Sequence, residues 1–164
     1  MTPAELEATV LPKLDTLYRV AQRLVSGSAD AEDLVASTLE AGFKSCAQCD
    51  GRYPLAWLLQ IMRNLSRHHY RHQARVAASE TDLEVVIDPA AHHRFLAKIS
   101  ELDVIAALER LPEEYRLVVT LCDLEELDYV EAALVLDVPV GTIRSRLSRG
   151  RKLLQDRLVR WSQS

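Results

Sequence analysis

Apolar residues recur at helical spacing from the beginning of the chain. Thr2, Pro3 and Glu5 have the pattern of a capping box with proline at the first helical position, which predicts a helix start. The residues that share one face of this helix are Leu6, Val10, Leu14, Leu17, Ala21 and Leu24. The pattern therefore predicts an amphipathic helix that ends near Gly27, with Pro12 bending it or marking the start of its longer part.

Two further helices are predicted in the first half. Ser28 or Asp30 can cap the first of them, which has carboxylates in its first turn and runs towards Phe43. Residues 45–54, SCAQCDGRYP, are rich in turn-forming types, and Pro54 can open a long third helix. The apolar stripe of the third helix is Leu55, Leu58, Ile61, Met62 and Leu65. The first half thus reads as a small helical unit.

Helical periodicity returns after an acidic segment at residues 77–99, which we interpret as a linker. A helix is predicted from near Glu101 to Leu111, and Pro112 opens another. No stretch shows the alternation of a strand. We therefore predict an all-α fold with two small helical domains, 1–76 and 100–164.

Residues 129–158 have the pattern of a helix-turn-helix. The small pair Ala132 and Ala133 allows a second helix to approach closely, and Leu134 and Leu136 are expected to face inward. After a break, Thr142 can cap the second helix, whose buried stripe is Ile143, Leu147 and Leu154. The opposite face carries Arg and Ser side chains, as a helix that enters the major groove requires.

Composition limits the class of protein. With 48% apolar and 27% charged residues, the chain is typical of a folded domain and not of a disordered one. It has no apolar run near the roughly 18–20 residues that span a bilayer, and its N-terminus is unlike a signal peptide, so we expect a cytoplasmic protein without membrane insertion. The 3 cysteines are too few for a disulfide framework. No nucleophile motif, phosphate loop or carboxylate pair indicates an enzyme.

The net charge of −4 conceals two basic blocks, at residues 63–75 and 140–160. In the first block, arginine recurs every fourth residue without any acid. Local positive charge of this kind favours contact with a polyanion whatever the net charge. The alternative is that either block is only a solvated helix face.

Three motifs in order resemble a known family. Residues 108–154 are similar to region four of the extracytoplasmic-function sigma factors, which belong to the sigma-70 family. DAEDLV at 30–35 resembles the region-two helix that binds RNA polymerase, and PLAWLLQIMRN at 54–64 resembles the helix that opens the promoter minus-ten element. The resemblance implies an alternative sigma factor that binds core RNA polymerase and promoter DNA, directs melting and transcription initiation, and is controlled by an anti-sigma factor.

The resemblance also implies roles for individual residues. Those expected to contact core polymerase are Asp30, Glu32, Asp33, Leu34 and Val35. Those expected at the minus-ten element are Trp57, Arg63, Asn64, Arg67 and Arg71. Those expected at the minus-thirty-five element are Thr142, Arg144, Ser145, Arg146, Ser148, Arg149 and Arg151. The loop at 46–54 is expected to select the minus-ten base.

Two alternatives remain open from the sequence. Cys46 and Cys49 have the CxxC spacing of a metal or redox pair. A closed zinc site needs four ligands, but His68, His69 and His72 lie in a basic helix where a metal would compete with four arginines, so no metal or cofactor is expected. The chain could also be a helix-turn-helix regulator that binds an operator without acting as a sigma subunit. Such a regulator needs a dimerisation surface or ligand pocket in the place that the 30–35 and 54–64 motifs occupy.

Overall fold

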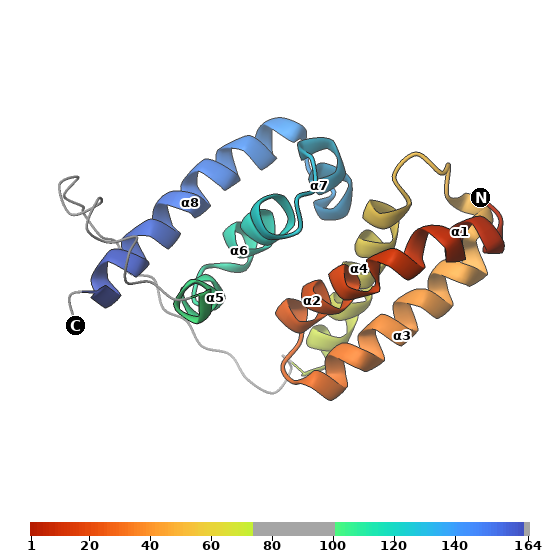
Figure 1. The fold of residues 1–164 in the computed structure, drawn as a ribbon, viewed down its shortest axis with the longest axis horizontal. Coiled ribbons are helices and arrows are strands. Elements are labelled where there is room, and N and C mark those ends of the chain that lie inside the picture. Colours follow the sequence, from red (N-terminus) through yellow and green to blue (C-terminus); the bar gives the residue numbers. More distant parts are fainter. Residues whose placement is uncertain (74–100, 163–164) are drawn as a thin grey trace.

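The computed structural model describes residues 1–73 and 101–162, with side chains described for 1–67 and 102–160. Every regular element in these ranges is a helix, and the helices form two groups that lie side by side (Figure 1). The predicted all-α fold with two helical domains is therefore confirmed. The predicted linker at 77–99 lies outside the described residues.

The first group contains four helices. They are α1 (Pro3–Val10), α2 (Leu14–Leu24), α3 (Ser28–Ser45) and α4 (Pro54–Gln73), with a 3-10 turn at Leu11–Lys13 between α1 and α2. The predicted capping box is present: Glu5 N–H donates to Thr2 Oγ1 over 3.3 Å, and Thr2 N–H donates to Glu5 Oε2 over 2.7 Å. The break around Pro12 is also confirmed, because a ring without an N–H cannot continue the hydrogen-bond ladder of α1.

Helix α3 begins and ends differently from the prediction. Its N-cap is Gly27, whose φ of 105° suits glycine, and no side chain caps the helix. Ser28 is already helical, so the expected Ser28 or Asp30 cap was wrong, and α3 continues to Ser45 instead of Phe43. Gly42 is buried where α3 crosses α4, and a Cβ there would overlap Leu58.

The second group contains α5 (Glu101–Glu109), α6 (Glu113–Val119), α7 (Tyr129–Leu136) and α8 (Val140–Ser162), with a π-helical turn at Thr120–Leu124. Helix α7 begins with a second capping box, in which Asp128 accepts from Glu131 N–H over 2.8 Å and Glu131 accepts from Asp128 N–H over 3.0 Å. It ends at Asp137, which adopts the left-handed conformation at φ 53°. The capping box at Asp128 therefore fixes the start of this short helix, and Asp137 fixes its end.

Two details of the helix-turn-helix prediction were wrong. Helix α8 begins at Val140, so Thr142 lies inside its first turn, where its N–H donates to Pro139 O over 2.9 Å. Leu134 is 43% exposed and does not face the core, whereas Leu136 is buried as predicted. Ile143 and Leu147 are buried as expected, and Leu154 is half-buried.

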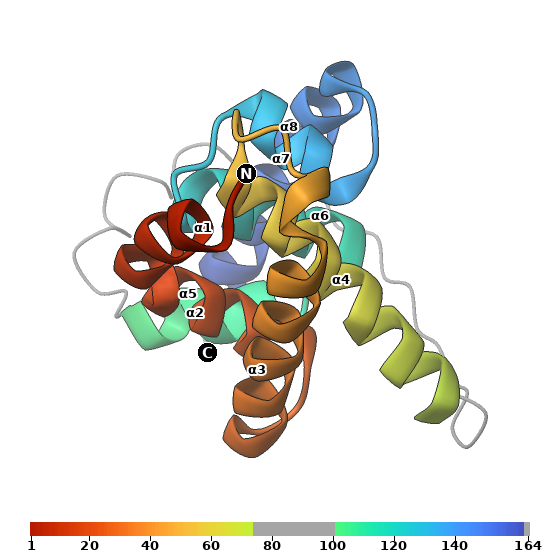
Figure 2. The ribbon, with the colours of Figure 1, turned by 90° about the vertical axis from the view of Figure 1, so that its right-hand side faces the viewer.

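Helix α4 joins the two groups, because it packs on α3 along one side and on α7 along another. Figure 2 shows that its C-terminal half projects beyond the other helices of the first group. A second bridge lies at α2, where Arg19 forms a bidentate ion pair with Glu125 of the second group. The positions of α4 and α7 decide which candidate binding residues are accessible.

Candidate nucleic-acid interface

The outward face of α8 carries the first cluster of candidate residues. Arg144, Ser145, Ser148 and Arg149 are exposed on it, and Thr142 is half-buried. The Arg144 guanidinium lies 5.9 Å from the centre of the Tyr129 ring, a cation–π distance that holds the side chain near α7. A shallow cavity of about 430 Å³ follows this face and is lined by Tyr129, Arg144, Leu147, Ser148, Arg151, Lys152 and Gln155. The helix thus presents cations and hydroxyls together, as groove readout requires.

Two arginines of α8 are engaged by acids of the second group. Arg151 donates from Nε and Nη2 to the two Asp123 oxygens over 2.9 and 2.6 Å. These hydrogen bonds raise the pKa of Arg151 above its ordinary value. Arg146 lies 3.2 Å from Glu114 of α6 and is only partly exposed. Contact of either arginine with a phosphate would therefore replace an existing ion pair.

The second cluster lies on α4, where the candidate residues differ sharply in exposure. Asn64 and Arg67 are exposed and Trp57 is half-buried, whereas Arg63 is only 9% exposed. Arg63 Nη1 donates to the carbonyl oxygen of Leu136 over 3.0 Å, and burial lowers the pKa of the Arg63 guanidinium. Arg71 belongs to α4, but its side chain lies outside the described ones.

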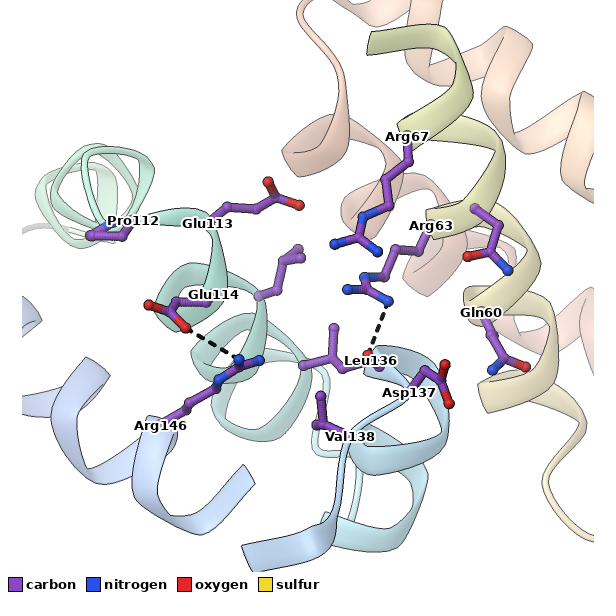
Figure 3. A pocket seen from close by; sticks show the side chains of 12 residues that line it. Gln60, Arg63, Arg67, Pro112, Glu113, Glu114, Leu136, Asp137, Val138 and Arg146 are labelled. Carbon is purple, nitrogen blue, oxygen red and sulfur yellow. Dashed lines mark hydrogen bonds and ion pairs between the residues drawn. The ribbon is translucent and has the colours of Figure 1, made fainter. Parts of the chain in front are cut away.

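A polar cavity of about 580 Å³ lies between part of α4 and the second group (Figure 3). Arg63 and Arg67 point into it from α4, and Glu113 faces them from α6. Arg63 Nε is buried there, and none of the described residues forms a hydrogen bond with it. The cavity therefore has guanidinium groups on its α4 side and carboxylates on the side of the second group.

A smaller cavity of about 390 Å³ lies beside Trp57. Its lining comes from the 46–54 loop and α4 on one side and from α7 on the other: Gln48, Cys49, Asp50, Arg52, Tyr53, Trp57, Gln60, Val130 and Leu134. Aromatic and amide groups are the partners that an unstacked base uses. The cavity adjoins the loop that we expected to select a base.

The third candidate cluster begins α3. Asp30, Glu32 and Asp33 are exposed within its first two turns, where carboxylates are favoured by the positive end of the helix dipole. Leu34 is buried and Val35 is half-buried against the core, so these two support the helix more than they present a surface. The structure thus brings the acids together on an accessible helix end.

Comparison with known proteins matches both helical groups. A model of sigma-70 region 2 matches residues 11–76, and a model of sigma-70 region 4 matches residues 101–154. The chain is 36% identical over 152 residues to the ECF RNA polymerase sigma factor SigE of Mycolicibacterium smegmatis, covering 90% of this chain and 59% of that protein. It is 33% identical over 135 residues to the ECF RNA polymerase sigma factor EcfG of Rhodopseudomonas palustris, covering 79% and 72%.

A solved structure agrees with these matches. The sigma factor RpoE of Bartonella quintana, in complex with the anti-sigma factor NepR, superposes with a TM-score of 0.73 at 29% identity, covering 93% of this chain and 95% of that one. Both helical groups therefore have the architecture of the sigma-70 class. Within that class, the chain belongs to the ECF RNA polymerase sigma factors.

The sequence pattern did not predict which acids pair with the arginines of α8 and α2. Asp123 and Glu114 are 28 and 32 positions from their partners on α8, and Glu125 is 106 positions from Arg19. Pairing over such separations depends on how the helices pack, so helical periodicity carries no signal of it. Only the acidic bias of residues 101–139 could have indicated that acids lie near the basic α8.

The cysteines do not form a disulfide or a recognisable metal site in the described part of the chain. Cys46 and Cys49 are buried free thiols, and Cys122 is a half-buried one. Among the residues with described positions, no His, Cys, Asp and Glu side chains gather in threes as a metal site needs. None of the helices in the described ranges is both long and apolar enough to cross a bilayer.

Proposed function

We propose that this chain is an alternative sigma subunit that binds core RNA polymerase and directs promoter recognition, DNA melting and transcription initiation in the cytoplasm. The domains would be 1–76 for polymerase and the minus-ten element, 77–99 as linker, and 100–164 for the minus-thirty-five element. The sigma factor family is not an enzyme class, and we assign this chain no reaction of its own. The observation that carries the proposal is the presence of both sigma-70 regions, in order, on one chain.

The acidic start of α3 is proposed as the polymerase anchor. Asp30, Glu32 and Asp33 are exposed together, so they can meet basic groups without rearrangement of the core. Asp33→Lys would put a like charge where we expect an ion pair, and binding to core polymerase should weaken by a few kcal/mol if that contact is buried. Glu40→Gln, further along the same helix, is the control. Equal polymerase affinity of the Asp33→Lys variant and the natural protein would remove the assignment.

Promoter DNA is proposed to contact α4 and α8. On α8, Arg149 and Ser148 lie on the exposed face, which supports direct contact with base edges. On α4, the cavity beside Trp57 supports binding of an unstacked base, with Asn64 and Arg67 accessible to the same strand. Arg63 and Arg71 complete the proposed minus-ten set. The roles of Arg144, Ser145, Arg146, Arg151 and Thr142 are proposed for the minus-thirty-five element.

An anti-sigma factor is the proposed regulatory partner. Support comes from the Bartonella quintana structure, in which a sigma factor of matching architecture is bound to an anti-sigma factor. The chain also offers two helical groups with cavities between them, which a partner could occupy.

The decisive experiment mixes purified protein with core RNA polymerase and a library of promoter fragments. We expect co-elution of the protein with polymerase and run-off transcripts from defined start points. A helix-turn-helix regulator would instead bind duplex DNA alone and leave core polymerase unable to initiate. Comparison of the Asp33→Lys variant with the natural protein distinguishes a sigma subunit from a helix-turn-helix regulator, because only a sigma subunit depends on the α3 acids.

A further inference from the structure

Tyr129 lies on the face of the second helical group that is proposed to meet DNA, although the family resemblance assigns it no promoter contact. It is the first residue of α7, which packs beside α8 (Figure 1). Tyr129 is 39% exposed and lines the cavity of about 430 Å³ along the outward face of α8, together with Arg144, Ser148 and Arg151. An aromatic ring thus shares one surface with three residues proposed to contact DNA.

The position of Tyr129 is fixed by the start of α7. Asp128, the residue before it, accepts a hydrogen bond from Glu131 N–H over 2.8 Å and donates its own N–H to Glu131 Oε2 over 3.0 Å. These two hydrogen bonds define where the helix begins and therefore the backbone conformation of its first residue. Ala132 and Ala133, one turn later, are buried where α7 packs on its neighbours. The ring is therefore attached to a backbone with little freedom to move.

Arg144 and Arg151, seven residues apart on one face of α8, are held in different ways. Asp123 binds Arg151 through its Nε and Nη2 donors, over 2.9 and 2.6 Å. Within the described part of the chain, no acid forms an ion pair with Arg144. Its guanidinium carbon lies 5.9 Å from the centre of the Tyr129 ring, within the range of about 6 Å for a cation–π interaction.

A ring and a carboxylate leave an arginine with different binding capacity. A carboxylate occupies N–H donors and offsets the positive charge, so a new partner has to replace an existing pair. A ring attracts the cation through its face and takes up none of the five N–H donors in a conventional hydrogen bond. Arg144 is therefore restrained while its donors stay available. A side chain that is already restrained also loses less conformational entropy on binding.

We propose that Tyr129 is a positioning residue for promoter readout, which orients Arg144 to read a guanine of the minus-thirty-five element. Guanine is the base that offers an arginine two acceptors, O6 and N7, in the major groove. The ring orients the guanidinium before DNA binds and does not itself contact the base. The inference rests on the proposed sigma function and adds a residue of α7 to a readout otherwise assigned to α8.

Two substitutions at Tyr129 separate the ring from the hydroxyl. Holoenzyme reconstituted with core RNA polymerase would be mixed with promoter fragments in which every minus-thirty-five base is varied, and the bound fragments would be sequenced. Tyr129→Leu should lower the preference for guanine at one position by about twofold to fivefold, the range of an exposed cation–π contact. Tyr129→Phe should keep the preference of the natural protein. Phe43→Leu is the matched control, because it removes a ring of similar exposure, 37%, from α3.

A double-mutant cycle shows whether Tyr129 acts through Arg144. Arg144→Ala alone should lower the guanine preference at the same position by about fivefold or more. Tyr129→Leu should then cause no further loss, whereas in the Arg149→Ala background it should cause the same loss at this position as in the natural protein. A full additional loss in the Arg144→Ala background would overturn the inference, because Tyr129 would then act independently of Arg144.

The contact can also be measured without DNA. In NMR spectra of the free protein, a ring-current shift of the Arg144 Cδ protons should be present in the natural protein and in Tyr129→Phe, and it should disappear in Tyr129→Leu. Equal midpoints of urea unfolding would show that the variants keep the fold. Identical Arg144 shifts in all three proteins would overturn the inference, because the ring would then not hold this side chain.

The remaining outcomes distinguish the positioning role from the sigma function. Equal losses in Tyr129→Phe and Tyr129→Leu would assign the effect to the hydroxyl, and a loss spread uniformly over all promoter fragments would assign it to general affinity. Either result would overturn the inference, as would an unchanged guanine preference in Tyr129→Leu. Failure of the natural holoenzyme to select any minus-thirty-five base would contradict the proposed function as well, whereas the other outcomes concern variants and overturn the inference alone.

Discussion

Asp123 is expected to restrain DNA binding by α8, because it holds Arg151 in a bidentate ion pair with contacts of 2.9 and 2.6 Å. Asp123→Asn keeps the size of the side chain and removes its charge. Arg151 would then be free to meet a phosphate, and one acid would be lost from the surface that faces DNA. The substitution should therefore strengthen DNA binding and make it more dependent on salt.

The expected gain in DNA affinity follows from the exposure of the Arg151 and Asp123 side chains. Because the Arg151 and Asp123 side chains are 55% and 30% exposed, their ion pair is screened and contributes only about 0.5 kcal/mol. Loss of the acid from within about one Debye length of the phosphates adds a similar amount, so affinity should rise about fivefold near 0.1 M salt. One more neutralised phosphate steepens the slope of log K against log salt by about 0.9, which removes most of this gain by about 0.5 M.

The assay is fluorescence anisotropy with a non-specific 20-base-pair duplex over a salt series. Glu40→Gln is the control, because it makes the same change in net charge on α3, within an exposed pair with Lys44. The control should leave both the affinity and the slope close to those of the natural protein. Unchanged affinity and slope in Asp123→Asn would show that Arg151 does not approach DNA phosphates, and equal changes in both variants would reduce the effect to net charge.

Three further outcomes are expected. Arg149→Ala should cost about 1–3 kcal/mol at one base position of the minus-thirty-five element, and a loss spread uniformly over a promoter library would make Arg149 a phosphate contact instead. Gly42→Ala should lower the free energy of unfolding in urea by about 1–2 kcal/mol, because overlap with buried Leu58 outweighs the gain in helix propensity; an unchanged midpoint would contradict this packing. Burial raises the pKa of Cys122 to about 11, with help from the neighbouring Asp123 charge, so its alkylation at pH 8 should be far slower in the native than in the urea-unfolded chain and should accelerate as the pH approaches 11. Equal native and unfolded alkylation rates, measured by mass spectrometry, would refute that environment.

Local chemistry was sufficient to predict much of the fold. The Thr2 capping box, the break at Pro12 and the helix start at Pro54 all follow from groups within a few residues of one another. The wrong helix starts have local causes too: Gly27 caps α3 through its positive φ, and α8 begins at Val140, directly after Pro139 and two residues before Thr142. Such starts are hard to predict because several residues in a row are acceptable caps.

The candidate site was less predictable, because its accessibility depends on contacts between distant segments. A separation of four residues between Arg63, Arg67 and Arg71 predicted that they share one helix face. It did not predict that α7 would bury Arg63 at one end of this face. Leu134 was expected to face inward from its helix pattern alone, yet it lies half-exposed at the contact between the two helical groups. Periodicity assigns a face to each side chain, and only tertiary packing decides what covers that face.

Helix α4 is unbroken from Pro54 to Gln73, so in the proposed role it would fix the distances along a bound single strand of DNA. At about 1.5 Å per residue, the Cα positions of Trp57 and Arg71 are roughly 21 Å apart along the axis. Stacked nucleotides advance about 3.4 Å each along one strand, so this length corresponds to about six nucleotides. Insertion of one residue between these positions would turn the later arginines by about 100° around the helix. In the proposed role, the spacing between a captured base and its backbone contacts would therefore be set by the backbone of one helix and not by adjustable loops.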